Sequence, residues 1–209
     1  WRFLLRHEPI GWDDLVRGKV QFEGRNLSDP VLVREDASPL YTLTSVVDDL
    51  DMAISHVIRG EDHVANTATQ IQIIDALGGG TGSAADPIAF AHLPLLVGAG
   101  GEALSKRDGA LGLNDLREDG IEPMAVNSLL ARLGTSDPVQ PVADMESLAE
   151  GFAWDRSSRA SPRFDSAELA QLNARLLHAL PHDAVRDRLD ALGITAVDET
   201  ADAAFWNAV

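Results

Sequence analysis

The chain has 209 residues, of which 45% are hydrophobic and 24% charged, a composition typical of a folded protein with one large domain or two small ones. It contains no cysteine, which excludes disulfides, thiol catalysis and cysteine-ligated metals and fits a cytoplasmic protein, and no apolar run approaches the roughly 18 residues of a membrane span. The net charge of −16 means that any nucleic-acid partner must meet a local basic patch.

The first stretch, from Trp1 to about Val47, predicts an extended, sheet-like segment. Apolar residues between turn residues indicate short strands at 18–22 and 31–34. The second stretch, from about 48 to 119, alternates strand and helix.

In this second stretch a strand at 56–60 stops at a glycine, a helix follows over 67–77, and the apolar run 88–97 has the length of a buried strand interrupted by Pro94. Gly78 is expected to end the helix. The order strand, helix, strand indicates an α/β fold of the doubly wound kind, in which ligands bind at the carboxyl ends of the strands.

The last third predicts three helices. The first begins at Pro123 and ends at Gly134; the second is opened by Asp165, with Glu168 three residues on as in a capping box. The third begins near Pro181 and ends at Gly193. Their apolar stripes are Val126, Leu129, Leu130 and Leu133; Leu169, Leu172 and Leu176; and Val185, Leu189 and Leu192.

One loop carries a polyphosphate-binding pattern. Only Lys19 and Lys106 are lysines, and the second lies in the glycine-flanked segment GAGGEALSKRDGALG. Such a loop can bring the cations of Lys106 and Arg107 and backbone N–H groups to a phosphoanhydride as charge develops on it. A solvated surface turn explains the same tripeptide, so the motif alone leaves both readings open.

A second group of residues lies in SPLYTLTSVVDDLDMAISHVIRGEDH. Arg59 ends an apolar strand, and its planar guanidinium suits a carboxylate-bearing substrate, while Asp62 can accept hydrogen bonds from hydroxyl or amino groups. The alternative is that Arg59 pairs with Glu61 or Asp49 on the surface.

Metal binding is not predicted, because the six histidines have no ligand spacing, and no GxSxG, HExxH or P-loop pattern occurs. Arg156, Arg159 and Arg163 form a local basic cluster beside Trp154 and Phe164, which suits a nucleic-acid backbone. A solvated loop is the alternative.

In this order the segments PLYTLTSVVDDLDMAISHVIRGEDH and FAHLPLLVGAGGEALSKRDGALGL, with the weaker GIEPMAVNSLLARLG and RFDSAELAQLNARLLHALP, resemble glutamyl-tRNA synthetases, a class I aminoacyl-tRNA synthetase family. The resemblance covers nearly the whole chain. It implies ATP-dependent ligation of L-glutamate to tRNA, with ATP and Mg²⁺ as substrate complex, no protein-bound metal, no membrane and a monomeric parent.

The resemblance also implies roles for individual residues. LSKR stands at the family's KMSKS-type loop, so Lys106 would be catalytic and bind ATP phosphates together with Ser105 and Arg107. Tyr41 and Arg59 fall on the glutamate pocket. Asp62 stands where the family has an acidic residue for the ATP ribose.

The implied domains are the end of an acceptor-stem-binding insertion (1–47), the second half of a Rossmann-like nucleotide-binding domain (48–97), a stem-contact region with the LSKR loop (98–164) and the start of a helical anticodon-binding domain (165–209). The HIGH signature is absent from these 209 residues. We therefore expect a fragment preceded by roughly a hundred residues, inactive alone and prone to associate through exposed strand edges.

Two rivals stay open at this point. One is the shorter paralogue that attaches glutamate to a modified tRNA base, disfavoured because helical sequence continues after Asp165. The other is a non-enzymatic synthetase relic that binds tRNA or a protein.

Overall fold

The computed structural model describes residues 1–78, 88–104 and 112–193, which belong to two compact units. The first unit contains Trp1–Leu95 and Trp154–Pro162. The second contains Leu96–Ala153 and the chain from Arg163 onward. None of the described helices is both long and apolar enough to cross a membrane.

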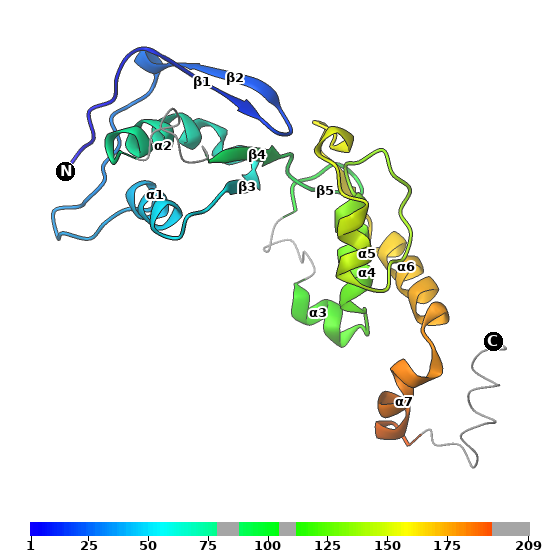
Figure 1. Ribbon diagram of the computed structural model, residues 1–209. Helices are drawn as coiled ribbons and strands as arrows, with labels where there is room; N and C mark the ends of the chain where they lie inside the picture. Colours follow the sequence, from blue (N-terminus) through cyan, green and yellow to red (C-terminus); the bar gives the residue numbers. More distant parts are fainter. Residues whose placement is uncertain (79–87, 105–111, 194–209) are drawn as a thin grey trace. The chain divides into compact units, whose positions relative to one another are not determined.

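The first unit is built on a four-stranded sheet in the order β2-β1-β4-β3 (Figure 1). The hairpin of β1 (Pro9–Asp14) and β2 (Gly18–Glu23) is antiparallel. The strands β3 (His56–Gly60) and β4 (Ala89–Leu93) pair in parallel, from His56 opposite Ala89 to Gly60 opposite Leu93. A single parallel bridge, Asp14 opposite Phe90, joins the two pairs. The predicted α/β class is confirmed.

Two helices accompany this sheet: α1 (Tyr41–Asp51) and α2 (Val64–Ala76), which follows the 3-10 turn η2 (Glu61–His63). They pack against each other, and the core between helices and sheet contains Val46, Ile71, Ile73, Ile74 and Phe90. A continuous run of buried residues, Thr67 to Ile74, places α2 deep in the unit. The short 3-10 helices η1 (Gly24–Asn26) and η4 (Trp154–Arg156) also belong to this unit.

The prediction of an extended chain as far as Val47 was wrong, because α1 begins at Tyr41. The apolar residues Leu43, Val46 and Leu50 have helical spacing and face the core. The strand expected at 31–34 is also absent; Val31 and Val33 form isolated bridges only. The strand expected over 88–97 ends at Leu93, because the following Pro94 has no N–H to donate to a ladder.

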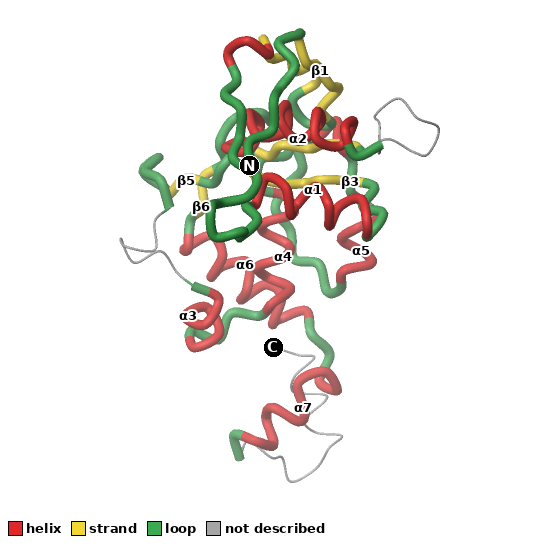
Figure 2. The backbone as a smooth tube through the Cα atoms, turned by 90° about the vertical axis from the view of Figure 1, so that its left-hand side faces the viewer, coloured by secondary structure: helices red, strands yellow, loops and turns green. Residues whose placement is uncertain are grey.

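The second unit is mostly helical: α3 (Leu113–Glu118), α4 (Pro123–Arg132), α5 (Met145–Glu150), α6 (Ser166–Ala179) and α7 (His182–Ala191). A short parallel pair, β5 (Val97–Gly98) and β6 (Arg163–Phe164), completes it. The helices α4 and α6 pack side by side (Figure 2). Their buried core is Leu116, Ala125, Leu129, Leu169, Leu172 and Leu176.

The helix ends largely follow the sequence signals. The Asp165 carboxylate accepts a hydrogen bond from the Ala167 backbone N–H at 2.8 Å and caps α6, although Glu168 makes no reciprocal bond among the described residues. Gly193 follows α7 with a φ of +71°, the conformation that favours glycine. The predicted apolar face of α7 is wrong at Leu192, which is 73% exposed.

Candidate active site

The sequence-predicted residues of the first unit gather at the carboxyl end of β3. Arg59 lies opposite His92 in the β3–β4 register, one residue before the strand ends. Tyr41 is the first residue of α1, and Asp62 lies in η2 between β3 and α2. The site therefore occupies the edge of the sheet at which parallel α/β folds bind ligands.

The Arg59 guanidinium is held by four acceptors. Its Nη1 donates to the Tyr41 hydroxyl at 3.2 Å, and its Nη2 donates to Thr67 Oγ1 and Gln70 Oε1, both at 2.6 Å. Its Nε donates to His92 Nε2 at 3.3 Å. None of these acceptors is a carboxylate, so the charge is fixed in direction and is not neutralised by an ion pair with any described residue.

The structure does not contain the alternative interaction considered for Arg59, a surface ion pair with Glu61 or Asp49. Glu61 pairs instead with Arg17 at 2.5 Å. Asp49 forms no ion pair with Arg59; burial raises the pKa of Asp49, the charge of Arg59 opposes that rise, and Asp48 adds to it. A cation without a paired carboxylate, with one Nη1 N–H still available, suits an anionic ligand.

Behind Arg59 lies a buried acid–histidine pair. His92 Nδ1 and Asp14 Oδ2 are 2.5 Å apart, and both side chains are fully buried. Asp14 Oδ1 accepts from the backbone N–H groups of Val16, Arg17 and His92 at 3.0 to 3.2 Å, and Oδ2 also accepts from the Trp12 indole at 3.3 Å. These donors satisfy the carboxylate in its ionised form.

The pKa values of the pair follow from this environment. Burial would raise the pKa of Asp14, but the hydrogen bonds from His92, Arg17 and Val16 hold it below its ordinary value. Burial lowers the pKa of His92 although Asp14 opposes this, and the charges of Arg59 and Arg17 lower it further. The pair is therefore an ionised carboxylate beside a neutral imidazole.

The Asp62 carboxylate lies close to the backbone of Gly60. A Cβ on Gly60 would lie 2.5 Å from Asp62 Oδ1 and 3.0 Å from Leu95 Cδ2. The Asp62 side chain is 56% exposed and 3.7 Å from His63 Nε2. The His63 ring in turn meets the Tyr41 ring edge-on, with centroids 5.9 Å apart.

The other predicted site residues are placed differently. Ser105, Lys106 and Arg107 lie outside the described residues. Arg156 and Arg159 belong to the first unit, where Arg159 Nε donates to the Val16 carbonyl at 3.3 Å. Arg163 belongs to the second unit, in which it pairs with Val97, so no common surface is defined for the three arginines.

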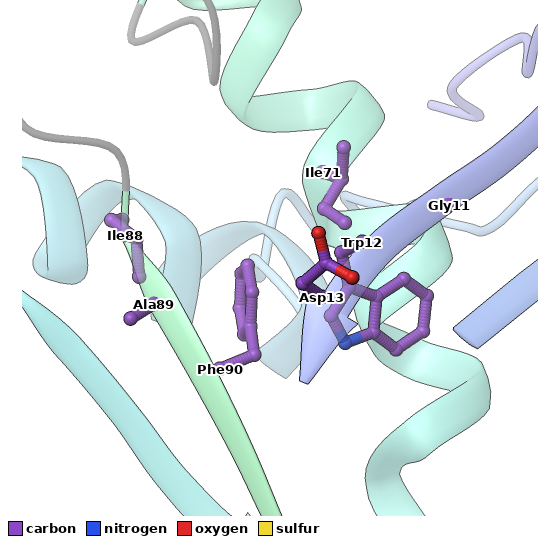
Figure 3. Close-up of a pocket in the computed structure, with 7 residues that line it drawn as sticks. All are labelled: Gly11, Trp12, Asp13, Ile71, Ile88, Ala89 and Phe90. Atoms are coloured by element: carbon purple, nitrogen blue, oxygen red, sulfur yellow. The ribbon is translucent and has the colours of Figure 1, made fainter. Parts of the chain in front are cut away.

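A separate hollow of about 420 Å³ lies where β1 and β4 diverge (Figure 3). It is lined by Gly11, Trp12, Asp13, Ile71, Ile88, Ala89 and Phe90. Its lining includes the Asp13 side chain among apolar residues and contributes no hydrogen bond to Arg59. Within residues 1–78, 88–104 and 112–193, no group of three or more acidic or histidine side chains is arranged to hold a metal ion.

The Arg59 cluster is the set of hydrogen-bonded residues Asp14, Tyr41, Arg59, Thr67, Gln70 and His92. Sequence reasoning missed four of them: Asp14, Thr67, Gln70 and His92. A signal for His92 existed, because a histidine inside the apolar run IAFAHLPLLV has to find a buried partner. Thr67 and Gln70 are polar residues three apart on a buried helix, which is a weaker signal of the same kind. Asp14 carried no signal, since its partner is 78 residues away.

The chain is similar to known proteins of one family. Residues 2–171 match the family described as "tRNA synthetases class I (E and Q), catalytic domain". The chain is 57% identical over its whole length to a glutamate–tRNA ligase of Azospirillum brasilense and 53% identical to one of Maricaulis maris, spanning 45% of each.

A solved glutamate tRNA ligase from Elizabethkingia meningosepticum, in complex with its amino acid, has the same fold, with a TM-score of 0.78 and 27% identity over 95% of this chain and 43% of that one. The chain thus spans less than half of the relatives that it matches. By the extent of these matches, it belongs to the class I tRNA synthetases for glutamate and glutamine.

Proposed function

We propose that this chain is the part of a glutamate–tRNA ligase that holds the glutamate side chain and contributes to the ATP site. The α-carboxylate of glutamate attacks the α-phosphate of ATP, giving glutamyl-adenylate and releasing pyrophosphate. A terminal ribose hydroxyl of tRNA then takes the glutamyl group and releases AMP. Positioning and charge stabilisation supply the catalysis, without a covalent enzyme intermediate.

The Arg59 cluster is the observation that carries the proposal. Its guanidinium is fixed by four neutral acceptors and has no carboxylate partner among the described residues. A substrate carboxylate would supply the missing counter-charge, whereas the neutral amide of glutamine would leave it uncompensated. The Tyr41 hydroxyl lies beside the same guanidinium and can contact the bound side chain.

The remaining proposed roles concern ATP and tRNA. Asp62 is exposed enough to accept a hydrogen bond from the ATP ribose. Lys106 stabilises the pyrophosphate leaving group, with Ser105 and Arg107 shaping its loop, and Mg²⁺ arrives with ATP. Arg156, Arg159 and Arg163 contact the tRNA backbone, and the full-length protein acts as a monomer.

The glutamate role is tested by glutamate-dependent ATP–pyrophosphate exchange in the full-length protein. Arg59→Gln should raise the KM for glutamate by at least about thirtyfold, because removing one partner of a buried charge pair costs about 2–5 kcal/mol, and leave the KM for ATP nearly unchanged. The matched control is Arg25→Gln, an exposed arginine beside Glu23. An unchanged KM for glutamate in Arg59→Gln would refute the proposal.

The leaving-group role calls for a second experiment on the same protein. Lys106→Ala should slow single-turnover adenylate formation by about a hundredfold or more, the scale seen when a transition-state charge contact is lost, while the Kd for tRNA stays within about twofold. Equal losses in the two measurements would contradict it. Full-length protein that binds tRNA but catalyses no exchange would favour the non-enzymatic relic.

A further inference from the structure

The Arg59 guanidinium is connected to a buried charge through one imidazole. Asp14, at the end of β1, contacts His92 Nδ1 in β4 at 2.5 Å. His92 Nε2, on the other side of the ring, faces Arg59 Nε in β3 at 3.3 Å. Three neighbouring segments of the sheet therefore contribute one residue each to a continuous row of hydrogen bonds.

The donors in this row can be assigned from chemistry. Arg59 Nε carries a proton and can only donate, so His92 Nε2 must present its lone pair. The ring proton is then on Nδ1, where the Asp14 carboxylate accepts it. Asp14 thus selects the tautomer of His92 that can accept from Arg59.

Thr67 adds a second contact to the same acceptor. Its hydroxyl lies 2.9 Å from His92 Nε2 and also accepts from Arg59 Nη2 at 2.6 Å. The imidazole and the hydroxyl together fix the Nε edge of the guanidinium. The Nη1 atom, which contacts Tyr41, keeps the remaining free N–H.

We infer that Asp14 and His92 are positioning residues that orient Arg59 for the side-chain carboxylate of the amino-acid substrate. This inference rests on the proposed function, because it assumes that Arg59 binds that carboxylate. Neither residue contacts substrate: both side chains are fully buried, so they act only through the direction that they give to the guanidinium.

Two substitutions at one position separate this role from plain packing. In His92→Gln the amide can reach the place of Nε2 and accept from Arg59, but the contact with Asp14 is lost. In His92→Asn the amide lies near the place of Nδ1 and can donate to Asp14, but nothing accepts from Arg59. Both replace a buried ring, so both should lower the Tm of the full-length protein.

The measurement is the KM for glutamate and for ATP, with kcat, in pyrophosphate exchange by the full-length protein. We expect His92→Asn to raise the KM for glutamate about tenfold, roughly the effect of one charge-assisted hydrogen bond, with the KM for ATP within about twofold. His92→Gln should stay within about threefold of the parent. Asp14→Asn, the second variant, should also raise the KM for glutamate, because the asparagine amide can donate to His92 Nδ1 and the ring proton would then lie on Nε2, facing the Nε–H of Arg59.

The outcomes distinguish this inference from the proposed function. The positioning role is overturned if the KM for glutamate in His92→Gln equals or exceeds that in His92→Asn. A raised KM in Arg59→Gln would still support the proposed function in that case. A normal KM in Arg59→Gln would refute the proposed function itself. If neither His92 variant folds, a KM for glutamate in Asp14→Asn equal to that of the parent overturns the inference.

Discussion

Arg17 and Glu61 form an ion pair of 2.5 Å that ties the turn of the β1–β2 hairpin to the first residue after β3. Arg17 also donates its backbone N–H to Asp14, so the same turn contacts both the ion pair and the buried acid. Glu61 therefore forms its ion pair with Arg17 and not with Arg59. The hairpin thus helps to keep a neighbouring carboxylate from competing for the proposed substrate-binding guanidinium.

The first prediction concerns the strength of this pair. Its side chains are 34% and 31% exposed, which places it between a surface and a buried ion pair. A double-mutant cycle of Arg17→Met and Glu61→Gln, followed by urea unfolding, should give a coupling free energy of about 0.5–1 kcal/mol. The coupling should fall as NaCl is raised, because salt screens partly exposed charges. A coupling free energy of zero at low salt would show that the ion pair contributes nothing to the stability of the fold.

The second prediction is a pH dependence of stability. The folded-state pKa values of Asp14 and His92 both lie below their ordinary values of 3.8 and 6.5. In both cases the unfolded chain binds more protons than the folded one between the two pKa values. Each group's contribution to the free energy of unfolding is therefore fully present above its ordinary pKa and is lost as the pH falls through its folded-state pKa. For His92 the loss begins below about pH 6.5.

His92→Gln should flatten this dependence below about pH 6.5, where one titrating group contributes up to about 1.4 kcal/mol per pH unit. The check is the free energy of unfolding of parent and variant at each pH. His178→Gln, which removes an exposed histidine on α6, is the matched control for the loss of a histidine from the chain. An equal slope in the parent and His92→Gln would show that His92 does not titrate differently on folding.

The third prediction compares two adjacent leucines of α4. Leu129 is fully buried in the core of the second unit, whereas Leu130 is 45% exposed. Leu129→Ala should lower the free energy of unfolding by about 3–4 kcal/mol, since it removes buried methyl groups and leaves a cavity. Leu130→Ala should cost less than about 1 kcal/mol, with the same change in helix propensity. Similar losses would mean that α4 packs through a different face.

The fourth prediction tests the basic residues proposed to contact tRNA. Arg163 is exposed on β6. In the full-length protein Arg163→Ala should weaken tRNA binding and reduce the slope of log K against log salt by about 0.7–0.9, the change expected for one lost phosphate contact. Arg25→Ala, at an exposed arginine outside the cluster, should leave that slope unchanged. The same slope in both variants would exclude Arg163 from the interface.

The helix α6 shows where periodicity was sufficient. Leu169, Leu172 and Leu176 were predicted as one helix face and are buried in the core. Pro123 begins α4 and Asp165 caps α6, as their sequence signals indicate. These features depend on residues within a few positions of each other, so local sequence determines them.

Some predictions from sequence patterns were wrong. The run around Val46 became the helix α1, which packs against α2, and Val31 and Val33 made only isolated bridges. Leu192 was predicted to be buried, but it is exposed. Tertiary pairing decided the outcome for Val31 and Val33, because a strand needs a partner strand along its length. The spacing of Leu43, Val46 and Leu50 already indicated a helix, and Leu192 lies beyond the last residue of α7.

The proposed glutamate site divides in the same way. Tyr41, Arg59 and Asp62 stand in one motif of the family, so the sequence by itself was enough to nominate them. The acid–histidine pair behind Arg59 was decided by the tertiary structure alone, because Asp14 and His92 are 78 residues apart and meet through strand pairing. A buried charge requires partners, but only folding determines which residues supply them.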